Sequence, residues 1–95
     1  MMSIYSIRDN KASAFNTPFF SESDVLATRS LTQAVRDPRL QLSMFPEDFD
    51  LYRLGLYDPV SGIISPAKQP EFVVSAVAVF SPIVKKGDSD VSSNS

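Results

Sequence analysis

The sequence predicts an α+β domain in which a small antiparallel sheet packs against one main helix. Two segments rich in β-branched and aromatic residues, at about residues 2–7 and 49–57, flank a segment whose apolar residues recur at helical spacing. With 43% hydrophobic and 21% charged residues, the composition is typical of a folded protein, and 95 residues are enough for one core. We therefore expect one domain over residues 1–86.

The first strand is predicted at residues 2–7, where Ile4, Tyr5 and Ile7 supply the β-branched and aromatic content of a strand. Residues 9–20 contain asparagine, serine, threonine and proline, which indicate a loop. We expect the phenylalanines of this loop to fold back and cover the core: Phe15, Phe19 and Phe20.

The main helix is predicted over about residues 22–37. Ser21 can cap its first turn, and Pro38 ends it because proline has no amide to donate and restricts the residue before it. Arg29 and Arg36 share the outer side of this helix, two turns apart. The opposite side collects a core stripe with one acidic residue at its solvent end: Asp24, Ala27, Leu31, Ala34 and Val35.

The residues in the second half of the chain indicate a β-hairpin. Residues 49–57 are apolar on both faces, which favours a central strand, and a turn cluster followed by a short return strand at 62–64 predicts antiparallel pairing. Residues 71–80 fit either a further strand, because of their valines, or a short helix, because Pro70 suits a first helical position. Residues 87–95 are rich in serine and are expected to form a disordered tail.

The residue types that catalysis most often uses are missing. Cysteine and histidine are absent, and none of the three glycines belongs to a phosphate-binding loop. We therefore expect a binding protein without a cofactor rather than an enzyme. One carboxylate cluster, Glu47, Asp48 and Asp50, offers oxygen ligands for a divalent cation. Because Pro46 precedes it, a single helical turn with acidic residues at its start is favoured, and no metal site is predicted.

The sequence also predicts the cellular location of the protein. No apolar run reaches the roughly 20 residues that span a bilayer, and the N-terminus lacks the pattern of a secretory signal. The missing cysteines give no indication of an oxidising compartment. We expect an intracellular protein that is not associated with a membrane.

Basic and aromatic residues occur together at two places in the predicted sheet. The net charge of −2 argues against a protein that neutralises many phosphates, although residues 1–40 carry five basic against four acidic side chains. Rings that stack on bases and cations that contact phosphates bind single-stranded nucleic acid. The alternative is that the tyrosines only pack in the core and the hairpin. The candidate DNA-binding residues are Tyr5, Arg8, Lys11, Arg29, Arg36, Arg39, Tyr52 and Arg53.

Six short motifs occur in a defined order: IYSIRDNKA at 4–12, PFF at 18–20, ATR at 27–29, VRDP at 35–38, FPEDF at 45–49 and LYRLGLYD at 51–58. In order and spacing, the chain resembles over about residues 2–64 the small nonstructural protein, often labelled DNA-binding protein, of gokushoviruses. These are tailless single-stranded DNA phages of the Microviridae. The valine-rich segment and the tail depart from that pattern.

The resemblance implies a protein made in the cytoplasm of an infected bacterium and absent from the mature virion. It implies a role in replication of the circular genome or in its transfer to packaging, with single-stranded DNA as the partner. It supplies no catalytic or ligand residues.

A second hypothesis is a protein-interaction module that recruits or modulates a phage or host replication protein. Residues 41–60 carry four acidic side chains against one basic side chain, and Val25 and Leu26 lie off the core stripe of the helix. A homodimer is a further expectation, because so small a sheet exposes a strand edge.

Overall fold

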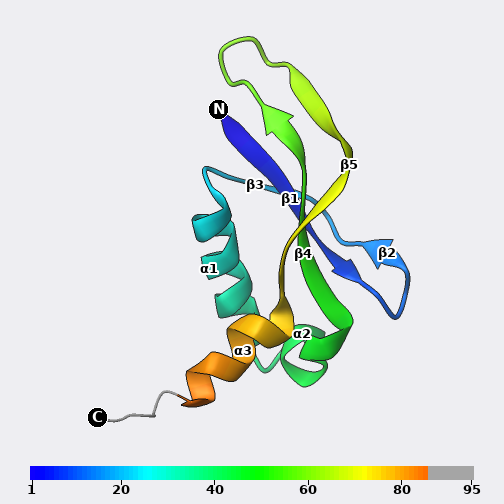
Figure 1. Cartoon of the computed structure of the whole chain (residues 1–95), viewed down its shortest axis with the longest axis vertical. Helices are drawn as coiled ribbons and strands as arrows, with labels where there is room; N and C mark the ends of the chain where they lie inside the picture. Colours follow the sequence, from blue (N-terminus) through cyan, green and yellow to red (C-terminus); the bar gives the residue numbers. More distant parts are fainter. Residues whose placement is uncertain (86–95) are drawn as a thin grey trace.

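The computed structural model describes the backbone of residues 1–85 and the side chains of residues 1–80. Its centre is a five-stranded antiparallel sheet (Figure 1). The long strands β1 (Met2–Asp9) and β4 (Phe49–Tyr57) pair side by side, and β5 (Ile64–Ser75) pairs with the other edge of β4. Two short strands, β2 (Ala14–Phe15) and β3 (Phe19–Ser21), pair with the remaining edge of β1. The predicted α+β class is confirmed.

The helical segments lie together at one end of the sheet (Figure 1). They are α1 (Asp24–Val35), α2 (Gln41–Met44), the 3₁₀ turn η1 (Pro46–Asp48) and α3 (Ala76–Lys85). The turn between β4 and β5 extends away from them, at the top of the view. None of the helices in the described part of the chain is long and apolar enough to cross a membrane.

The hydrophobic core forms between α1 and one face of the sheet. Leu31 and Val35 of α1 are fully buried against Tyr5 and Leu51, which lie on neighbouring strands. Ala27 completes the buried side of the helix, so the predicted stripe is confirmed. The other two residues of the stripe are less buried: Ala34 packs partly against the core, and Asp24 accepts a hydrogen bond from the Tyr5 hydroxyl at 2.5 Å.

The start of α1 differs from the prediction by two residues. Ser23, not Ser21, is the N-cap, because its Oγ accepts a hydrogen bond from the amide of Leu26 at 3.2 Å. Ser21 belongs to β3, where its backbone is already engaged in the sheet. The helix ends with Arg36 as its C-cap, shortly before Pro38 as expected.

The segment predicted as a loop at residues 9–20 contains two short strands, so that prediction is wrong in part. The free edge of β1 exposes amides and carbonyls that need partners, and β2 and β3 supply them. Phe19 packs on the core and stacks on Tyr5, with ring centroids 5.9 Å apart. Phe15 and Phe20 do not cover this core but project from the other face of the sheet.

The predicted hairpin is confirmed, with Tyr57 paired to Ile64, but its return strand is much longer than residues 62–64. Residues 71–80 are both strand and helix, since β5 continues to Ser75 and α3 begins at the next residue. Gly55 is required where the strands meet, because an added Cβ would lie 2.5 Å from the carbonyl oxygen of Ser65.

The outer edge of β5 is poorly suited to pairing with a second chain. Pro66 and Pro70 remove two amide donors from it, and the register against β4 shifts at two places. Both features are typical of edges that do not extend a sheet. The argument for a homodimer from an exposed strand edge therefore has no support at β5. The tail predicted to be disordered, residues 87–95, lies outside the described residues.

Candidate functional site

The face of the sheet opposite the helices carries a row of aromatic side chains. Tyr5 and Leu51 face the helices, and side chains alternate along a strand, so Ser6 and Tyr52 face the other way. Phe15 of β2 and Phe72 of β5 flank Tyr52, with ring centroids 5.5 and 5.9 Å from it. We call the surface formed by Phe15, Tyr52 and Phe72 the open face.

Ser6 allows these rings to meet across β1. It is paired with Tyr52, is fully buried, and its small side chain leaves room for the rings above it. Its Oγ donates a hydrogen bond to the carbonyl oxygen of Asn16 at 2.6 Å, so the hydroxyl is satisfied beneath the rings. The aromatic row therefore lies over a part of the sheet in which both the backbone and the Ser6 side chain are hydrogen-bonded.

The two phenylalanine rings of the open face are accessible to a ligand, and Tyr52 between them is half-buried. Phe72 is 59% exposed and Phe15 is 38% exposed. Phe20 and Tyr57 form a second edge-to-face pair further along the same side of the sheet, with centroids 5.4 Å apart. Large apolar rings that stay exposed in this way are typical of binding surfaces.

Arg8 supplies a positive charge at one end of the row. Its guanidinium carbon lies 5.3 Å from the centroid of the Phe15 ring, a cation–π contact. Its Nε donates to the side-chain oxygen of Asn10 at 3.1 Å, and Asn10 in turn donates to Asp50 at 2.9 Å. The guanidinium is thus held over the ring with further donors free for a ligand.

The structure brings together only two of the eight predicted DNA-binding residues on the open face, Arg8 and Tyr52. Tyr5 is fully buried, so the prediction that its ring stacks on a base is wrong. Arg53 lies on the helical side, where it pairs with Glu71 at 2.8 Å and approaches Asp24 at 3.6 Å.

The remaining candidates are on other surfaces. Arg29 of α1 and Arg36, the C-cap residue of that helix, are exposed in the layer on the opposite side of the sheet. Arg39 forms an ion pair with Asp37 at 2.8 Å, and Lys11 lies in the turn between β1 and β2. These residues therefore do not line one continuous basic groove.

Sequence reasoning missed Phe15 and Phe72 as site residues. The sequence predicts a core position for Phe15 because it lies in a segment without strand character, and Phe72 lies in a run where every position is apolar. The cross-strand register places both rings beside Tyr52. One signal was present in the sequence. Side chains alternate along β1, so Arg8 and Ser6 lie on one face of the sheet and Tyr5 and Ile7 on the other.

The buried Tyr5 hydroxyl makes the stability of the fold depend on pH. Burial and the hydrogen bond to Asp24 raise the pKa of Tyr5 above its ordinary value of 10.0. The unfolded chain therefore releases this proton first, and stability should fall as the pH rises above 10.0 toward the folded-state pKa.

Urea unfolding at a series of alkaline pH values checks this effect. Tyr5→Phe should be less stable at neutral pH, because Asp24 loses a donor, but should show a shallower loss of stability at alkaline pH. Tyr52→Phe, on the other face of the sheet, is the matched control. Equal alkaline slopes for Tyr5→Phe and the unaltered chain would contradict this account.

Comparison with known proteins found a match to one protein family. The sequence model of a family described as Phage ORF5 protein matches residues 2–79, which is most of the chain. No curated protein and no solved structure gives a significant match.

Proposed function

The chain belongs to the Phage ORF5 protein family, and from this premise we propose that it binds single-stranded DNA on the open face of its sheet. In this role it assists replication of a single-stranded DNA phage genome or its packaging. The observation that carries the proposal is the row of Phe15, Tyr52 and Phe72, in which the two phenylalanines are exposed and Tyr52 is half-buried between them, with Arg8 at its end. The chain acts as a binding protein and not as an enzyme.

Stacking on bases is the contribution that this surface is best suited to make. Each base that stacks on an aromatic side chain contributes about 1–3 kcal/mol, and every base offers a ring face. Stacking makes no distinction between base types, so the open face favours binding that tolerates any base sequence. A duplex, whose bases are already stacked and paired, gives such a surface little to bind.

Electrostatic attraction contributes little to the proposed binding. The net charge is −2, and Asp50 lies opposite Arg8 in the register of the sheet. Each neutralised phosphate of a single strand adds about 0.7 to the slope of log affinity against log salt. We therefore expect weak salt dependence with a slope of about 1 or less, in contrast to proteins with many phosphate contacts.

Arg8→Gln tests the contact at the end of the row. The change should weaken binding of a labelled single-stranded oligonucleotide and lower the salt slope by about 0.7, because one phosphate contact is lost. Arg29→Gln removes the same charge from the far side of the molecule and should leave both quantities unchanged. Equal losses in the two variants would mean that overall charge, and not the open face, governs binding.

The order of the short motifs supports a narrower proposal about the origin of the chain. We propose that it is a nonstructural protein of a gokushovirus, made in the cytoplasm of the bacterial host and absent from the virion. The support is the order of the short motifs within residues 2–64. Detection of the chain in infected cells but not in purified particles, by mass spectrometry, is the test.

Recruitment of a phage or host replication protein is the second candidate function. The observation that favours it is the apolar tip of the β4–β5 hairpin, where Val60 is 95% exposed and Ile63 and Ile64 are more than half exposed. This surface lies away from the helices and has no basic side chain of its own between Asp58 and Ile64. Absence of DNA binding would favour this candidate.

A further inference from the structure

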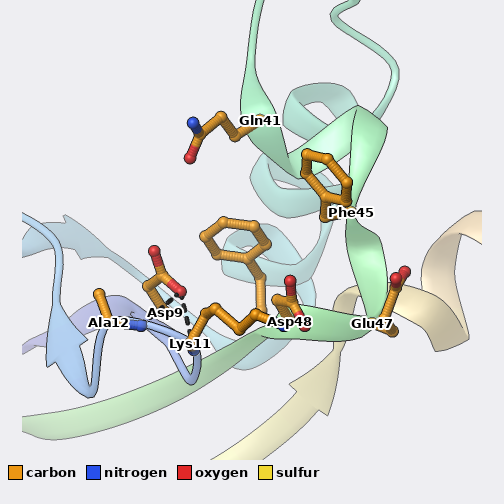
Figure 2. A pocket seen from close by; sticks show the side chains of 8 residues that line it. Asp9, Lys11, Ala12, Gln41, Phe45, Glu47 and Asp48 are labelled. Atoms are coloured by element: carbon orange, nitrogen blue, oxygen red, sulfur yellow. Dashed lines mark hydrogen bonds between the residues drawn. The ribbon is translucent and has the colours of Figure 1, made fainter.

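An open cavity of about 560 Å³ lies between the β1–β2 turn and the segment formed by α2 and η1. Figure 2 shows Gln41 and Phe45 on one side of it and Asp9, Lys11 and Ala12 on the other. Two aromatic rings line it: Phe49 is nearly fully buried, whereas Phe45 remains 46% exposed. The cavity therefore offers an accessible ring face inside a polar rim.

The charged groups of the rim are mainly acidic. Asp9, Glu47 and Asp48 line the cavity together with the single ammonium group of Lys11. Asp9 is engaged locally, because its Oδ1 accepts hydrogen bonds from the amides of Lys11 and Ala12 at 3.0 and 3.2 Å (Figure 2). Among the described side chains, Glu47 and Asp48 take part in no ion pair.

The 3₁₀ turn explains how these groups come together. Pro46 begins the turn, as the sequence predicts, so that Glu47 and Asp48 follow Phe45 at once. The N-cap residue of the turn is Phe45, whose side chain makes no capping hydrogen bond, and the amide of Phe49 at the other end donates to the carbonyl oxygen of Pro46. The backbone carbonyl of Asp48 accepts from the amide of Asn10 at 2.8 Å, which ties the turn to the end of β1.

We propose that this cavity binds an arginine side chain on a basic segment of a protein partner. A guanidinium group stacks on an aromatic face and donates paired hydrogen bonds to carboxylates, which are the two kinds of group that Phe45, Glu47 and Asp48 provide. Lysine suits the cavity less well, because its compact ammonium is more strongly hydrated. The excess of carboxylates repels a polyanion, so nucleic acid is not the occupant.

The cavity and the open face use different residues, so the inference does not rest on DNA binding. The two surfaces meet at the end of β1, where Arg8 faces the open face and Asp9 lines the cavity. A partner held in the cavity would therefore lie beside the proposed DNA.

Fluorescence anisotropy of a labelled peptide of alternating arginine and glycine, titrated with the full chain, tests the proposal. Glu47→Gln should weaken binding about threefold, the effect of one partly exposed ion pair. Glu22→Gln removes the same charge from an exposed position before α1 and should not weaken it. Equal losses in both variants, or no binding of the arginine peptide at all, would overturn the proposal.

Two further variants test the ring and the competing cation. Phe45→Leu keeps an apolar side chain but loses the ring face, and should weaken binding, whereas Phe20→Leu on the far side of the sheet should not. Lys11→Gln should strengthen binding, because it removes the positive charge that competes for the rim, and Lys68→Gln should not. Weaker binding by Lys11→Gln would contradict the assignment of the occupant as a cation.

Discussion

Phe72→Ser is expected to weaken binding of single-stranded DNA by about tenfold, and the double variant Phe15→Ser with Phe72→Ser by about a hundredfold. Each ring lost removes the stacking of about one base, worth about 1–3 kcal/mol, and about 1.4 kcal/mol is a factor of ten. Because Phe72 is more exposed than buried, serine there should cost little stability. Anisotropy of a labelled oligonucleotide measures the effect.

The matched control for this experiment is Phe45→Ser. Phe45 is a phenylalanine of similar exposure to Phe15 and Phe72, but it lines the cavity by α2 and not the open face. Its loss should leave DNA affinity unchanged, and circular dichroism should show that every variant keeps its fold. Similar small effects of Phe45→Ser and Phe72→Ser would show that the aromatic row is not the binding surface.

Leu31→Ala should lower the free energy of unfolding by about 2–5 kcal/mol, which is a large part of the stability of so small a domain. Leu31 is 1% exposed and lies in the centre of the core, between α1 and the sheet. Removing its side chain leaves a cavity that the neighbouring strands cannot fill without moving. Urea unfolding followed by circular dichroism measures the loss.

Leu26→Ala provides the comparison on the same helix. Leu26 is 39% exposed, so the same change removes far less buried surface and should cost less than about 1 kcal/mol. If the two variants lost equal stability, α1 would not present the Leu31 side to the sheet.

Local sequence signals predicted the parts of the fold that local physics determines. The apolar spacing of α1 identified Leu31 and Val35 as core, and proline placed the end of the helix correctly. The two-sided apolar character of residues 49–57 identified a central strand, and β4 does lie between β1 and β5.

The parts that sequence did not predict depend on contacts between distant residues. β2 and β3 are too short to show a strand pattern, and they exist because the edge of β1 needs partners. β5 continues through two prolines that would end a central strand, which an edge strand tolerates. Such features follow from position in the sheet and leave little trace in a short window of sequence.

The sequence predicted the kind of side chains in the candidate site, aromatic rings beside a basic residue, but identified only some of the residues. Aromatic rings beside a basic residue do occur on the sheet, and Tyr52 and Arg8 are among them. Alternation along β1 puts Tyr5 and Arg8 on opposite faces, but the side on which Tyr52 lies depends on how β1 and β4 pair, which the sequence does not give. A one-residue difference in register decides which ring enters the core and which faces outward.

Titration of a labelled single-stranded oligonucleotide with the unaltered chain, at low and at near-physiological salt, tests the central claim most directly. A duplex of equal length serves as the control. The account predicts binding of the single strand with weak salt dependence, and much weaker binding of the duplex. No binding of the single strand even at low salt, or equal binding of the duplex, would contradict it.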